Sequence, residues 1–142
     1  MASFAPGTTR LIGSIIKVHG TMSAGVAHEG SREVLRIHVN YLFVYPVEPP
    51  GRPQDWMRIV DRNYDDVDFY PWDDPGGALE PWLYAWTGDV AGGRCDINDG
   101  FIHPQYPTGP AGRTPPSGAP VNPYNLSAPP ATGEKCFSTT GT

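Results

Sequence analysis

The chain is organised around the stretch Val34-Leu-Arg-Ile-His-Val-Asn-Tyr-Leu-Phe-Val-Tyr45, its longest run of strand-favouring residues. Apolar and aromatic residues alternate along it from Leu35 to Tyr45, and polar residues take the other positions in its first half. Successive side chains of a strand point to opposite faces, so the pattern predicts a long strand that is buried on one side throughout and on both sides only in its second half. Pro46 cannot donate a ladder hydrogen bond, which predicts that the strand ends there.

The neighbouring segments predict an antiparallel meander. Residues 10–20 have the pattern of a first strand, and the turn composition of residues 23–31 would join it to the central strand as a hairpin. The proline-rich residues 47–55 predict a turn region. Beyond it, residues 56–61 predict a third strand, which breaks before a short fourth strand at 67–70 or continues there past a bulge.

Residues 79–87 are compatible with two structures. Pro81 favours the first position of a short helix, in which Trp82 and Trp86 would stack one turn apart. As a strand, the same segment would place Trp82, Tyr84 and Trp86 on one face.

The composition of the chain changes along its length. Gly and Pro number 17 each among 142 residues, and aliphatic residues become rare after Gly88. The chain length suits one domain, 1–142, of mainly β structure. We expect a small antiparallel meander of three to five strands in 10–70, an aromatic-rich turn region in 71–103, and an extended Pro/Gly-rich, loop-dominated coat in 104–142.

The charge balance disfavours two classes of partner. The net charge is −5 and the basic residues form no cluster, so we expect no nucleic-acid partner. No apolar run approaches the length that a bilayer requires, so we expect no membrane insertion. The first residues lack the basic start and apolar middle of a signal peptide, so an exported form would be a mature chain or a fragment.

Two cysteines, Cys95 and Cys136, lie far apart and form no metal-binding motif. They fit one disulfide or two free thiols, and we favour the disulfide because a Pro/Gly-rich tail has little core to hold it. Cys136 would then tie residues 104–142 back to the sheet. Closing a loop of this length stabilises a fold by roughly 4 kcal/mol. A disulfide implies an oxidising compartment, and therefore a secreted protein that is extracellular or at the cell surface.

One group of polar residues suggests an enzyme. If the sheet curves, His38 with a carboxylate would perform acid–base chemistry while other side chains orient a substrate. The candidates are His38, Asp61, Asp68, Arg36 and Asn40. The simpler interpretation is the solvated face of a half-buried strand, and the sequence holds no nucleophile or nucleotide-binding motif.

Metal sites are weakly indicated, and we expect no metal or other cofactor. Asp96, Asn98 and Asp99 resemble part of a calcium loop, but their spacing is one residue short and Tyr106 replaces the expected glutamate. A turn is the better interpretation. A second acidic group would suit a hard cation or a solvated loop: Asp61, Asp65, Asp66, Asp68, Asp73 and Asp74.

A dense set of aromatic residues allows two interpretations. Flat rings stack on sugars, so the set would form a glycan-binding strip, or it would form a packing layer at one edge of the sheet. Its members are Trp72, Trp82, Tyr84 and Trp86.

Four segments carry a resemblance to a group of known proteins: residues 35–51, 56–60, 72–77 and 99–104. Together they resemble secreted or lipoprotein-type actinobacterial proteins of uncharacterised function. The resemblance implies export and a curved sheet similar to nuclear-transport-factor-2-like folds. It implies no active-site residue.

These observations lead to three expectations about function. The first is a non-catalytic extracellular module for binding or assembly, through a protein partner or self-association, in which long strands pair at their edges. The second is a small enzyme with the His/Asp pocket on a curved sheet. The third is glycan binding through the aromatic strip.

Overall fold

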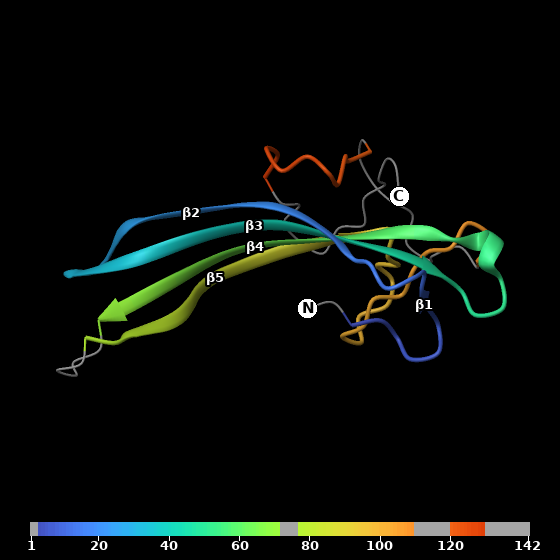
Figure 1. Ribbon diagram of the computed structural model, residues 1–142, viewed down its shortest axis with the longest axis horizontal. Helices are drawn as coiled ribbons and strands as arrows, with labels where there is room; N and C mark the ends of the chain where they lie inside the picture. The colour runs from blue at the N-terminus through green and yellow to red at the C-terminus, as the bar shows by residue number, and fades with distance from the viewer. Residues whose placement is uncertain (1–2, 72–76, 110–119, 130–142) are drawn as a thin grey trace.

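The protein is mainly β, and the computed structural model describes residues 3–71, 77–109 and 120–129. Its strands form one open antiparallel sheet (Figure 1). The elements are β1 (Arg10–Leu11), β2 (Lys17–Glu29), β3 (Arg32–Glu48), the 3-10 turn η1 (Pro53–Asp55), β4 (Met57–Pro71) and β5 (Leu79–Ala91). β1 and β2 pair with one edge of β3, β4 pairs with the other, and β5 lies outermost. The predicted mainly β class and small antiparallel sheet are therefore confirmed.

The central strand is longer than its sequence pattern predicts. β3 runs through Pro46 to Glu48 and, at about 3.3 Å per residue, spans roughly 55 Å. The prediction that Pro46 ends the strand is wrong. In an antiparallel strand the amide and carbonyl of one residue point to the same side, and the Pro46 carbonyl accepts from the Ile12 amide, on the side of β1. The donor that proline lacks is therefore not needed in the ladder with β4.

Two predicted interruptions are absent from the described sheet. Residues 23–29, predicted as part of a turn, continue β2 and pair with 32–38 of β3, so only Gly30 and Ser31 remain in the turn. Gly30 has a φ of 63°, which glycine adopts without steric cost. Of the two alternatives for 67–70, the separate fourth strand is wrong and the continuation of the third strand is confirmed, because β4 is continuous between two long partners and the bulge lies in β5. Pairing along β3 has overridden local composition in both places.

The ambiguous segment is a strand. Residues 79–87 belong to β5, so the helix alternative is wrong. Asp66 pairs with Ala85 and Val67 with Leu83, which leaves Tyr84 as the extra residue of a β-bulge. The bulge reverses the side on which the following residues point, so Trp86 does not share a face with Trp82.

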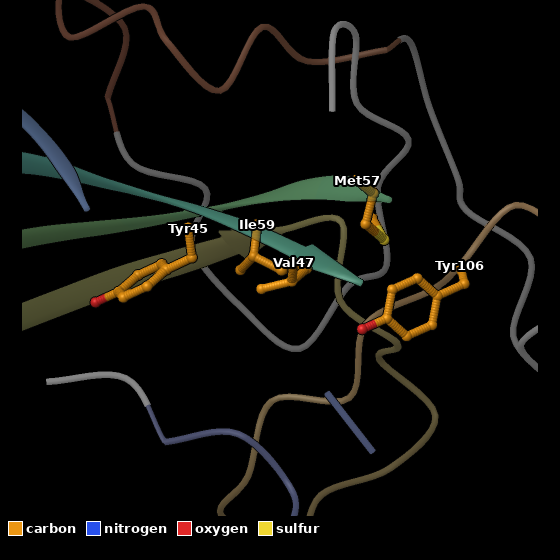
Figure 2. Packing of buried hydrophobic residues seen from close by; sticks show 5 residues of the cluster. All are labelled: Tyr45, Val47, Met57, Ile59 and Tyr106. Carbon is orange, nitrogen blue, oxygen red and sulfur yellow. The ribbon is translucent and has the colours of Figure 1, made fainter. Parts of the chain in front are cut away.

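Only one half of the sheet is covered by the rest of the described chain (Figure 1). We call this the proximal half; it holds β1, residues 42–48 of β3 and 57–62 of β4. Beneath it, Tyr45, Val47, Met57, Ile59 and Tyr106 form a buried cluster (Figure 2). Phe4 and Ile102 pack on this cluster, and the Phe4 and Tyr45 rings meet edge to face at 5.5 Å.

A second segment covers the other side of the proximal half. Tyr124 and Leu126 pack against a small cluster of Leu42, Val60 and Ala91. Arg62, only 4 % exposed, holds this segment by donating to the carbonyls of Leu126 (3.1 Å) and Ala128 (2.8 Å). Part of the expected C-terminal coat thus lies on the sheet, while Cys136 is outside the described residues and the disulfide stays a prediction.

Candidate functional site

The distal half of the sheet projects beyond the covered part (Figure 1). It consists of residues 20–29, 32–41, 63–71 and 79–88. Alternation along β3 and its pairing register with β4 define two faces. The network face carries Arg36, His38 and Leu42, and the apolar face carries Val39, Tyr41 and Tyr45.

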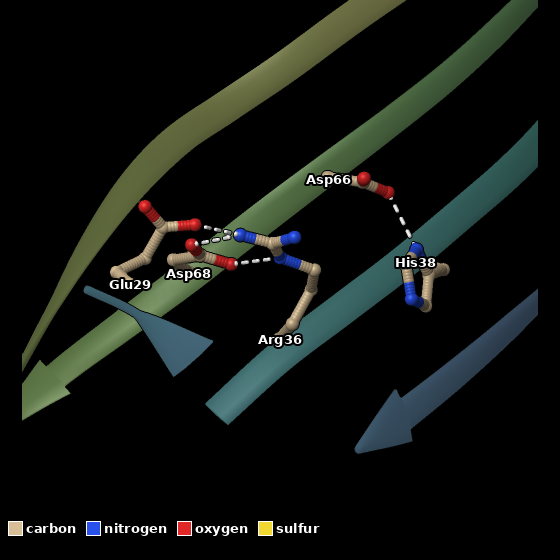
Figure 3. A network of polar contacts seen from close by, with 5 residues as sticks. All are labelled: Glu29, Arg36, His38, Asp66 and Asp68. Carbon is tan, nitrogen blue, oxygen red and sulfur yellow. Dashed lines mark hydrogen bonds and ion pairs between the residues drawn. The ribbon is translucent and has the colours of Figure 1, made fainter. Parts of the chain in front are cut away.

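The network face is built around one buried carboxylate. Asp68 is fully buried and accepts two hydrogen bonds of 2.6 Å from Nε and Nη2 of Arg36 (Figure 3). The same Nη2 donates to Oε1 of Glu29 at 2.7 Å. The Tyr84 ring lies 3.7 Å from the Arg36 guanidinium carbon, which adds a cation–π contact. The bulge in β5 is what brings Tyr84 to this face.

The electrostatics of this network favour both charged forms. The hydrogen bond from Arg36 lowers the pKa of Asp68, although burial opposes the change. The hydrogen bond to Asp68 in turn raises the pKa of Arg36. The two groups are therefore ionised at neutral pH and hold adjacent strands together.

Side chains of the network face also cover one another. Val34 is 2 % exposed and Asp68 is not exposed, although the described segment that reaches this face, residues 126–129, lies at its inner end near Asn40 and His38. Arg36 lies between Asp68 and Tyr84 and shields the carboxylate from water. The network face therefore needs no partner to cover its centre.

The apolar face is different. Seven of its large apolar side chains are exposed, from 38 % at Leu35 to 74 % at Trp86, six on the distal half and Val18 at its border. We call them the apolar patch: Val18, Met22, Val26, Leu35, Leu79, Leu83 and Trp86. At these exposures they present on the order of 800 Å², more than the largest patch of a typical monomer, about 300–600 Å². An exposed patch of this size is typical of an interaction surface.

Two carboxyl groups lie at the inner end of the apolar face. Asp61 is 8 % exposed and pairs with Phe43, and Asp65 pairs with Val39 and Trp86. Burial raises the pKa of both carboxyls, opposed at Asp61 by a hydrogen bond from Asn63. Within the described part of the chain, neither forms an ion pair with a basic side chain.

The predicted catalytic residues do not form one site. Arg36, His38, Asn40 and Asp68 share the network face, but Asp61 is on the apolar face. His38 Nδ1 contacts Asp66 Oδ1 at 2.6 Å and pairs with neither predicted carboxylate (Figure 3). Arg36 donates a hydrogen bond to Asp68. Asn40 accepts one from Arg62 and donates one to the Leu126 carbonyl. These side chains make structural contacts in pairs, so no shared acid–base centre is assembled.

The predicted aromatic strip is divided between the two faces. Trp82 and Tyr84 lie on the network face, and Trp86 lies on the apolar face. Trp72 is outside the described residues. Trp82 and Trp86 are 62 % and 74 % exposed, so these two rings are not core residues.

Two of the candidate metal ligands, Asp96 and Asp99, have protein partners. Asp96 accepts two hydrogen bonds from Arg94, and Asp99 contacts His103 and accepts from the Phe101 amide. Within the described residues no three His, Cys, Asp or Glu side chains gather as a cation site. Asp73 and Asp74 lie outside these residues.

Sequence reasoning missed the residues that make the distal half distinctive. Glu29 and Asp66 were not recognised as partners of Arg36 and His38, and Met22 and Val26 were not identified as part of a surface. A signal exists for the last two: residues 18, 22 and 26 are apolar at even positions, as in a strand with one apolar side.

Comparisons with known proteins give no match: no family model, no curated protein and no solved structure is similar to the chain. Among the described residues no helix is long and apolar enough to cross a bilayer.

Proposed function

We propose that the protein is a non-catalytic assembly module that associates with a second copy of itself through the apolar patch. The observation that carries the proposal is the contrast between the two faces of the distal half. The network face buries Asp68 and Val34 beneath its own side chains and exposes Tyr64, Trp82 and Tyr84, whereas the apolar face exposes seven large apolar residues. Burial of apolar surface is the main driving force of association.

The area of the patch fits a second copy. One partner contributes about 800 Å² to an interface of standard size, which is what the apolar patch presents. Two sheets pack face to face at about 10 Å, with their strands within about 30° of each other. A copy offers the same long sheet with the same apolar side, so each patch would cover the other in a two-fold contact.

An extracellular or cell-surface location belongs to the same proposal. It is supported by the two cysteines, whose pairing would need an oxidising compartment. Intact mass measured with and without reductant tests the disulfide directly.

Two tryptophans of β5 provide a matched test of the association. Trp86→Lys places a charge in the apolar patch, and Trp82→Lys places the same charge on the network face of the same strand. We expect wild type to exceed the mass of one chain in light scattering. We expect Trp86→Lys to weaken association by about 30-fold or more, as for a central aromatic contact, and Trp82→Lys to leave it unchanged.

Two results would contradict the proposal: a wild-type chain that stays monomeric at high concentration, or equal loss of association in both variants. Thermal unfolding of each variant verifies that it is folded. The glycan alternative is tested with the same proteins, because tryptophan fluorescence that changes with a polysaccharide in wild type but not in Trp82→Lys would favour it instead.

A further inference from the structure

The two outer edges of the sheet are protected to different degrees. In the described residues neither β2 nor β5 has a neighbour on its outer side. An exposed edge of this length is a template for pairing with another strand, and proteins normally block it with proline, charge or a bulge. β5 has all three: Pro81, the bulge at Tyr84, and the acidic Glu80 and Asp89.

β2 has none of these features between its ends. From Val18 to His28 it contains no Asp, Glu, Lys, Arg or Pro, and it pairs with β3 without a register shift. The thirteen residues of β2 therefore form a regular edge whose outer side pairs with no strand of the described chain. Charges appear only at the two ends, Lys17 and Glu29.

We infer that two copies join through their β2 edges, antiparallel, to form one continuous eight-stranded sheet with β1 beside it. In the register centred on Ser23, each residue faces the residue equally far from Ser23 on the other strand. Lys17 then lies opposite Glu29 of the second copy at both ends of the ladder, and opposite charges in directly facing positions are favourable. Glu29 would add this contact to the hydrogen bond it accepts from Arg36 through Oε1.

The same register preserves the two faces. Facing residues of an antiparallel pair point to the same side, so the apolar patches of the two copies lie on one side of the joined sheet. The contact is two-fold and closes on itself, so edge pairing alone does not extend into a fibre. This inference depends on the proposed self-association and specifies one of its contacts.

Two cysteine variants, Ser23→Cys and Thr21→Cys, test the register. In the centred ladder Ser23 faces Ser23 of the second copy, with Cα atoms about 4.5–5.5 Å apart, within the range of a disulfide. Thr21 faces Gly25, so the two Thr21 positions lie about 13 Å apart, too far for a disulfide. Under mild oxidation we expect Ser23→Cys to convert most of the chain to a covalent species of twice the chain mass. Thr21→Cys and wild type should not form it.

A charge pair provides a second test that needs no oxidation. Ser23→Lys and Ser23→Glu each place like charges in facing positions and should lose the edge contact. Mixing the two variants, each also carrying Trp86→Lys so that the apolar patch does not pair them, should restore it as a heterodimer, detected by native mass spectrometry.

Light scattering on the same samples separates the two proposals. If wild type associates and Trp86→Lys does not, but Ser23→Cys crosslinks no more than Thr21→Cys, then the edge inference is wrong and self-association stands. If wild type does not associate at all, both are wrong. A Ser23→Cys dimer together with recovery in the Lys/Glu mixture supports the edge contact.

Discussion

The two halves of the sheet share the same strands but are stabilised in different ways. In the proximal half, segments from both ends of the chain cover both faces, and Val47, Ile59 and Val60 are fully buried. In the distal half the described segments outside the sheet contact the inner end, where Asn40 donates to the Leu126 carbonyl. The strands of this half are held by their ladders and by the contacts of Arg36 with Asp68 and Glu29.

The comparison shows that the burial of a residue in this sheet depends on how far along its strand the residue lies. The described segments outside the sheet cover one half of these long strands, and the other half of the sheet projects beyond them. On the network face the projecting strands still bury Asp68, because Arg36 shields it from water. On the apolar face, projection leaves the apolar patch exposed within the described part of the chain.

The largest expected effect is the loss of unfolding free energy when the proximal core is disrupted. Ile59→Ala removes buried methyl groups and leaves a cavity, so we expect a loss of about 2–5 kcal/mol of unfolding free energy. The matched distal change is Val26→Ala on the apolar patch, 69 % exposed in the chain, which should cost within about 0.5 kcal/mol. Urea unfolding of both variants, at concentrations where the chain is monomeric, measures the contrast. Equal losses would mean that the two halves are stabilised alike.

An intermediate effect concerns the cover of the proximal half. Arg62→Met removes the donors to the carbonyls of Leu126 and Ala128, and we expect it to cost about 1–3 kcal/mol because these acceptors lose their partners. Faster amide exchange in residues 122–128 should accompany the loss. Arg58→Met on the same strand and face removes an exposed side chain 5.7 Å from the Tyr124 ring and should cost less. A larger loss at Arg58 than at Arg62 would contradict this account of the cover.

The smallest expected effect is a dependence of stability on pH, and it concerns the distal half. The pKa of Asp68 is lowered in the folded chain, so its carboxylate adds stability above the ordinary aspartate pKa of about 4. The contribution disappears as pH falls through the lower folded-state pKa, because the carboxyl is then protonated in both states. We expect the stability advantage of wild type over Asp68→Asn to be constant from neutral pH to about pH 4 and to shrink below it. Thermal unfolding of both chains across this range measures it, and an advantage independent of pH would exclude this role of the charge.

Most of the fold follows from alternation in the sequence. The central strand was predictable because apolar residues recur at every second position from Leu35 to Tyr45. The antiparallel arrangement was predicted correctly, whereas the predicted first strand at 10–20 is divided into β1 and β2. The extension of β2 through Ser23–Glu29 was not, because small residues there favour a turn locally and only pairing with β3 decides their conformation. The passage of β3 through Pro46 likewise depends on which side of the strand carries the missing donor.

Less of the candidate site was predictable. Arg36 and Asp68 were identified as candidates, but as parts of a pocket and not as partners, because their pairing depends on the register between β3 and β4. The apolar patch could not be recognised as exposed, since alternation predicts which side chains share a face and not whether that face is covered. Only the placement of the terminal segments over the proximal half decides this.

The bulge at Tyr84 has a consequence for how this strand tolerates changes in length. Deletion of that single residue would leave Ala85 and Leu83 in unbroken alternation, each opposite its present partner on β4 and on its present face. Trp82 and Trp86 would stay on opposite faces, and Arg36 would lose the ring above it. A three-nucleotide change in the coding sequence would thus remove one contact of the buried ion pair while both surfaces and every backbone ladder survive.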